Sequence, residues 1–188
     1  MVVDDILAIR ERWHTKRHPF FGALGEGKLP LRVLGIYMAM HWQFVQRALA
    51  SFGILFTRTF SQEDVRKMIV ENLAEEEGLK AIPREGHVPH DHGELIFRFC
   101  RAAGLSEPEV RAMKMTPAWW GRSLHYYQTA LQEPIGVVLA MQATQEGQQP
   151  ALNSEVVLPA LARHYGCMLR WASITDLYRR DYLGEKDV

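Results

Sequence analysis

Apolar residues recur at intervals of three and four along most of the chain, which is the spacing of one helix face. In the segment 61–78, for example, Val65, Ile69 and Leu73 share such a face. Runs of β-branched residues that alternate with polar ones are almost absent, and no Asn-Gly or Asp-Gly hairpin turn occurs. The pattern therefore predicts an all-α protein.

Prolines, glycines and capping residues predict where the helices begin and end. We expect a long apolar helix from Pro30 to about Ser51, and a helix that begins at an N-cap, Ser61, and ends at Gly78. Ser106 and Glu109 have the spacing of a capping box. Further helices are expected at about 3–15, 93–103, 117–132, 134–147, 153–169 and 171–183. The expected fold is a single-domain helical bundle of about seven to nine helices over residues 1–188.

Composition narrows the classes of function. The chain has 188 residues, 47% of them hydrophobic, and a formal net charge of +0, without the broad basic patch of a nucleic-acid-binding protein. No apolar run approaches the ~20 residues of a membrane span, and the first residues do not resemble a signal peptide. We therefore expect a cytoplasmic protein without nucleic-acid or membrane partners. Cys100 and Cys167 are expected to be buried free thiols.

Several polar side chains fall on faces that are otherwise apolar. Glu76 lies on the face of Val65 and Ile69, and Glu146 continues the apolar face of the segment 134–147. His41 lies on the apolar stripe of the long helix, with Tyr37 beside it. A buried carboxylate is costly unless it is paired or bound to a metal. Two interpretations stay open: these groups belong to a site, or the carboxylates mark helix ends in solvent and His41 is a core histidine with its hydrogen bonds made.

The segment "GHVPHDHGELIFRF", residues 86–99, contains a cluster of histidines. His87, His90 and Asp91 precede the periodic segment and are expected in a solvated loop. His92 is in phase with the apolar positions that follow it, so it is expected to face the core. Two inward carboxylates on separate helices and one inward imidazole are the kind of ligand set that non-haem iron uses.

Four motifs in order carry a resemblance to a known group of proteins. They are "HPFFGALGEGKLPLRVLGIYMAMHWQFVQR", "NLAEEEG", "HGELIFRFCRAAGL" and "ATQEGQQPALNSEVVLPALARHYG". Together they resemble the haem-oxygenase-like superfamily, in the branch of pyrroloquinoline-quinone synthase C, thiaminase II and the non-haem diiron oxidases and oxygenases. The resemblance extends from Trp13 to Tyr182. It implies a helical-bundle enzyme.

The resemblance also implies a metal site. Transferred residue by residue from the diiron members, the iron ligands would be Glu76, His92 and Glu146. In the hypothesis that follows, His41 and Tyr37 are the expected catalytic residues, at or beside the metal. One or two irons would react with O2 and a small substrate. The metal-binding members carry an aspartate and a histidine on their last long helix, whereas here no histidine follows His164. Asp181 is the candidate replacement ligand.

Three functions remain open at this point. The first is an iron-dependent oxidase or oxygenase, and the second is a metal-independent oxidase that resembles pyrroloquinoline-quinone synthase C. The third is a non-catalytic protein that binds a ligand or a partner. Thiaminase activity is not expected, because neither Cys100 nor Cys167 matches the position of that nucleophile. Dimerisation, which is common among such proteins, is left open by the sequence.

Overall fold

A computed structural model describes residues 2–79 and 91–166 of the chain. Throughout these residues the secondary structure is helical, and this part of the chain contains no β-strand. The predicted all-α, haem-oxygenase-like bundle is confirmed. No helix in the described residues is both long enough and apolar enough to cross a membrane.

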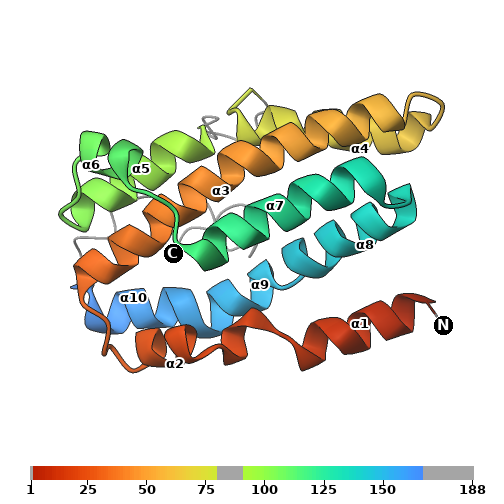
Figure 1. Ribbon diagram of the computed structural model, residues 1–188. Coiled ribbons are helices and arrows are strands. Elements are labelled where there is room, and N and C mark those ends of the chain that lie inside the picture. Colours follow the sequence, from red (N-terminus) through yellow and green to blue (C-terminus); the bar gives the residue numbers. More distant parts are fainter. Residues whose placement is uncertain (1, 80–90, 167–188) are drawn as a thin grey trace, which may run out of the picture.

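The bundle is built around one long helix, α3 (Leu31–Arg58), which packs most extensively against α7 (Pro117–Gln132) and α5 (His92–Ala102) (Figure 1). Helix α4 (Glu63–Glu76) runs back along α3. The close approach of α3 and α5 depends on Gly35, where an added Cβ would lie 2.8 Å from the Cβ of Ala103. This approach brings the first turn of α5 against the middle of α3.

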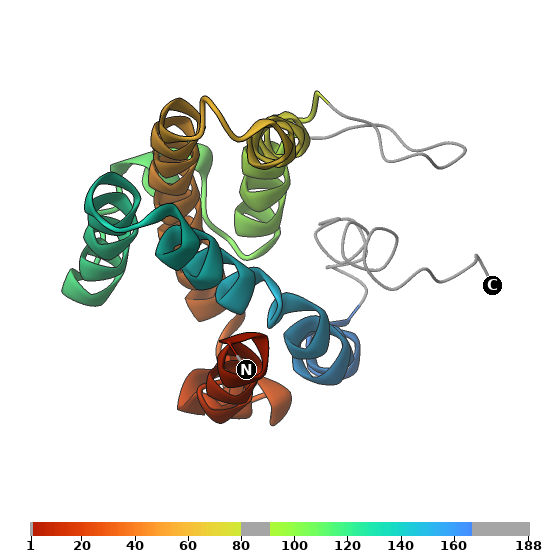
Figure 2. The ribbon, with the colours of Figure 1, turned by 90° about the vertical axis from the view of Figure 1, so that its right-hand side faces the viewer.

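Apart from α6, which packs against α5 and α3, the remaining elements form a second layer below these helices. Figure 2 shows α1 (Val2–Arg12) and α2 (Pro19–Gly25) at its base, beside α8 (Ile135–Glu146) and α10 (Leu158–His164). The shorter elements are η1 (Thr15–Arg17), α6 (Glu107–Ala112), α9 (Gln149–Leu152) and η2 (Asn153–Val157).

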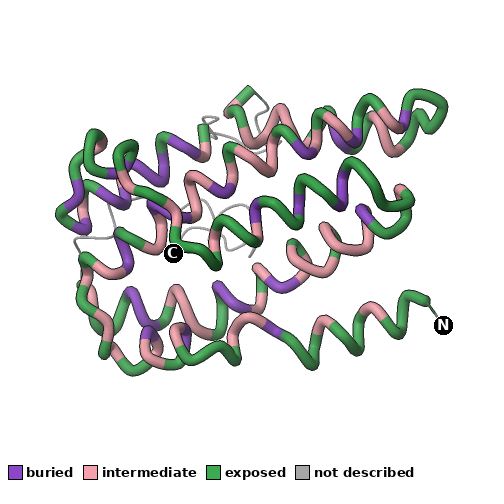
Figure 3. Tube along the Cα trace, in the orientation of Figure 1, coloured by how far each residue is buried: buried purple, intermediate pink, exposed green. Residues whose placement is uncertain are grey.

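Buried residues gather where the layers meet, as the purple segments of α3, α5 and α7 show in Figure 3. One cluster joins α3, α4, α7 and α8 through Leu55, Ile69, Ala130 and Val138, each at most 1% exposed. A second cluster joins α2, α3, α5 and the segment 152–161. These clusters hold in place the helices that carry the candidate site.

Several helix ends in the structure differ from the predicted ones. Helix α3 continues past Ser51 to Arg58, because Ser51 is buried and its hydroxyl donates to the Arg47 carbonyl within the helix. The N-cap of α4 is Gln62 rather than Ser61, and no side chain caps that end. Asp91 is not part of a free loop: its carboxylate accepts from the Gly93 and Glu94 backbone amides and caps α5.

Other helix ends lie where the sequence predicts them. The helix over 117–132 is confirmed, and so is the capping box of Ser106 and Glu109. The helix expected at 153–169 begins earlier, at Gln149, and contains the π-helical turn η2. The helix expected at 171–183 and the residues His87 and His90 lie outside the described residues.

Candidate functional site

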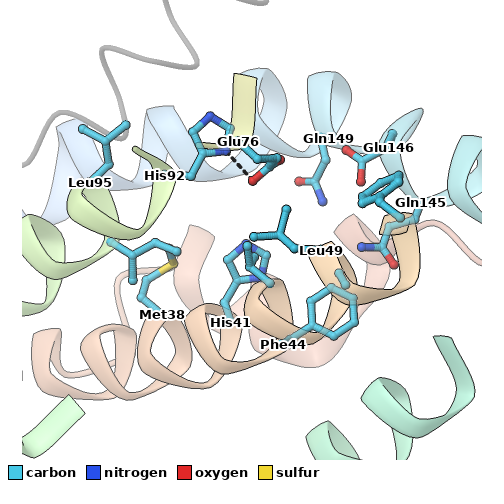
Figure 4. Close-up of a pocket in the computed structure, with 14 residues that line it drawn as sticks. Met38, His41, Phe44, Leu49, Glu76, His92, Leu95, Gln145, Glu146 and Gln149 are labelled. Atoms are coloured by element: carbon cyan, nitrogen blue, oxygen red, sulfur yellow. Dashed lines mark hydrogen bonds and ion pairs between the residues drawn. The ribbon is translucent and has the colours of Figure 1, made fainter. Parts of the chain in front are cut away.

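A cavity of about 100 Å³ lies between α3, α4, α5 and the end of α8 (Figure 4). We call it the Glu76 cavity. Its wall from α3 is largely apolar and includes Met38, Phe44 and Leu49. The polar groups on the other side come from three segments far apart in the sequence: Glu76, His92, Gln145, Glu146 and Gln149. A mostly apolar pocket with a few converging polar groups is the usual form of a small-molecule site.

Glu76 and His92 form the best-defined pair in this cavity. Glu76 is the last residue of α4 and His92 is the first residue of α5, so the pair joins the end of one helix to the start of the next. The His92 Nδ1 atom lies 2.8 Å from the Glu76 Oε2 atom, and the two side chains are 22% and 24% exposed. Burial lowers the pKa of His92, but the hydrogen bond and the charge of Glu76 outweigh it, and the pKa is raised overall.

Glu146 ends α8 and lines the same cavity. Glu146 is an exposed residue, yet partial burial of its carboxyl raises the pKa of this group, and the negative charge of Glu76 adds to this effect. In the view of Figure 4, Gln149 is drawn between Glu76 and Glu146. Within residues 2–79 and 91–166, no three His, Cys, Asp or Glu side chains lie close enough to hold a metal ion by themselves. Of the three predicted ligands, Glu76 and His92 are hydrogen bonded to each other, and Glu146 lines the same cavity.

His41 faces the Glu76 cavity from the middle of α3. Burial lowers its pKa to about 3, and the positive charge of Arg122 adds to this, so His41 is neutral at physiological pH. Its Nδ1 atom is buried and has no hydrogen-bond partner in the part of the chain that the structure describes. Tyr37, one turn earlier, is not in the wall of this cavity; it lines a neighbouring one, where burial raises the pKa of its hydroxyl.

Of the remaining predicted residues, only Cys100 is described by the structure, and it does not line this cavity. Asp181 lies outside the described residues, as does Cys167. Cys100 is fully buried, its thiol donates to the Gly35 carbonyl at 3.5 Å, and burial raises its pKa to about 11. A thiol with so high a pKa is a poor nucleophile. The expectation that Cys100 is a buried free thiol is confirmed.

Sequence reasoning missed the cation beside the site. The Arg122 guanidinium carbon lies 3.9 Å from the centre of the Phe44 ring, and its charge acts on both His41 and Glu146. Nearby, the Tyr126 hydroxyl donates to Gln145 Oε1. Helical phasing of α7 could have placed Arg122 near Tyr126, one turn away, but could not have shown which helix that face meets.

The raised pKa of His92 predicts a pH dependence of stability. Protonated His92 stabilises the metal-free fold below pH ~6.5, and this contribution is lost as the pH rises through the higher pKa of the folded state. Replacing His92 by Gln should remove that part of the dependence. Urea unfolding of wild type and His92→Gln at several pH values measures it, and a free-energy difference that grows with pH would contradict the prediction.

A comparison with known sequences identifies the family of this chain. No curated protein sequence matches the chain significantly. The sequence profile described as the TENA/THI-4/PQQC family matches residues 6–172, which is most of the chain and includes Glu76, His92 and Glu146. This match confirms the resemblance to the haem-oxygenase-like superfamily that the four motifs indicated. The chain belongs to the TENA/THI-4/PQQC family.

Proposed function

We propose that this protein is an iron-dependent oxidase or oxygenase that acts with O2 on a small metabolite. The observation that carries the proposal is the convergence of Glu76, His92 and Glu146 on one cavity with apolar walls. Carboxylates and an imidazole match the ligand preference of non-haem iron. Glu76, His92 and Glu146 would hold the metal, Asp181 is the candidate for a further ligand, and bound iron would supply the reaction with O2.

The surrounding residues fit this role in two ways. His41 is neutral, so it adds no positive charge that would repel a cation from the cavity. Burial raises the pKa of Glu146, and repulsion from the nearby Glu76 carboxylate raises it further. A metal ion would offset that repulsion, and it would compete with the proton that Glu76 and His92 now share.

The first test is the metal content of the full-length protein. After anaerobic reconstitution with Fe²⁺ and removal of free metal, we expect about one or two irons per chain. On admission of air, the loaded protein should also change its visible absorption spectrum. Iron well below one per chain, measured by elemental analysis, would contradict the proposal.

A second candidate function is a metal-independent oxidation by O2. It is favoured by one observation: across the described part of the chain, Glu76 and His92 are hydrogen bonded directly and no set of three donors is assembled. Such a pair can take a proton from a bound substrate and hold it. O2 consumption by protein that contains no metal would favour this candidate. If neither form of the protein consumes O2 with any tested metabolite, a binding role remains.

A further inference from the structure

A second cavity adjoins the Glu76 cavity and extends away from the carboxylates. It encloses about 90 Å³ between α2, α3 and the segment 149–161. Three residues, Met38, His41 and Gln149, line both cavities. Asn153 lines the second cavity but not the Glu76 cavity, and we call this second cavity the Asn153 cavity.

The walls of the Asn153 cavity are apolar and aromatic. The rings of Phe20 and Tyr37 stack with their centres 4.9 Å apart, and Phe21 meets Tyr37 edge-on at 5.9 Å. Among the described residues that line it, none is Asp, Glu, Lys or Arg. An ionised ligand group would find no opposite charge here, so the cavity favours a neutral group.

Asn153 is a buried polar residue in the wall of this cavity. It is only 6% exposed, and its Nδ2 atom has no hydrogen-bond partner among the described residues. It is also the first residue of the π-helical turn η2. Such turns are rare and often mark functional sites. A buried amide without a partner destabilises the fold, so its presence in an otherwise apolar wall calls for an external acceptor.

His41 lies between the Asn153 cavity and the proposed metal site in the Glu76 cavity. It lines both cavities, and within residues 2–79 and 91–166 its Nδ1 atom is also buried without a hydrogen-bond partner. Met38 also borders both cavities and has an unbranched, adaptable side chain. A molecule that extends from one cavity into the other would therefore pass His41 and Met38.

We infer that the Asn153 cavity binds the neutral, apolar part of the substrate, and that the Asn153 amide donates a hydrogen bond to a carbonyl or ether oxygen on it. The inference rests on the proposed function only in treating the two cavities as one site. A volume of about 90 Å³ is below the ~150 Å³ of an apolar cavity that admits benzene. The part bound there is therefore a short aliphatic chain or a small ring.

Two probes of nearly equal shape test the hydrogen bond. Acetone has a carbonyl oxygen where isobutene has a CH2 group, so the ratio of their dissociation constants isolates the acceptor. Both are titrated by NMR into the full-length, metal-free protein. In Asn153→Leu, the ratio should shift about three- to tenfold in favour of the hydrocarbon. Asn72→Leu is the matched control, because Asn72 also has a buried unpartnered atom but lines neither cavity.

An unchanged ratio in Asn153→Leu overturns the inference, and so does failure of both probes to bind the wild type. If Asn153→Leu does not fold, the ratio of dissociation constants is measured in Asn153→Ala instead. The shorter side chain leaves the same extra space for both probes, so the ratio still reports the hydrogen bond. Iron content is measured in the same variants and should be unaffected by Asn153→Leu. A shifted ratio in a protein that never loads iron would contradict the proposed function and leave the assignment of this cavity standing.

Discussion

Replacing His92 by Ala is expected to abolish iron binding. The change removes an imidazole that lies within hydrogen-bond distance of Glu76 and faces the Glu76 cavity. With His92 gone, the proposed ligands that remain in the described part of the site are the carboxylates of Glu76 and Glu146, a set better suited to Mg²⁺ or Ca²⁺ than to iron. Glu76→Ala should have the same effect if Glu76 is itself a ligand. Elemental analysis after anaerobic reconstitution measures both.

The matched controls are His125→Ala and Glu77→Ala, which change exposed residues of the same types in α7 and after α4. They should load iron as the wild type does. Glu76 could instead act by orienting His92 through their hydrogen bond, and Glu76→Ala would then weaken iron binding by about 10- to 100-fold without abolishing it. Full iron loading of His92→Ala would show that His92 is not a ligand.

The largest expected loss of stability comes from Leu55→Ala. Leu55 is 0% exposed and packs in the cluster that joins α3, α4, α7 and α8. Removing its branched end leaves a cavity that these four helices cannot fill, so the free energy of unfolding should fall by about 2–5 kcal/mol. For a chain of this size that corresponds to a melting temperature lower by roughly 4–20 °C. Urea and thermal unfolding measure the change.

Leu131→Ala is the control for that prediction. Leu131 is 47% exposed on α7, so the same substitution removes far fewer contacts and should change the free energy of unfolding by well under 1 kcal/mol. Equal effects of the two substitutions would mean that α3 is not packed as described. Since α4 and α8 carry Glu76 and Glu146, Leu55→Ala should also weaken iron binding.

Helical phasing placed Glu76, His92 and Glu146 on inward faces, and the structure brings all three to the walls of one cavity. Phasing works here because each of these side chains is in phase with apolar neighbours on its own helix, so local periodicity reports its direction. It failed for Ser61 and Asp91. Whether a residue caps a helix depends on where the first turn begins, and periodicity leaves that uncertain by one or two residues.

The sequence by itself determined the helical class, the family and the inward direction of the candidate ligands, because these depend on local spacing and on motifs read along the chain. Only the tertiary structure decided the rest. The 2.8 Å pairing of Glu76 with His92, the charge of Arg122 beside Phe44 and the cavity around Asn153 all join segments far apart in the sequence. Their geometry is set by how helices pack against one another, and the periodicity of a single helix contains no information on its neighbour.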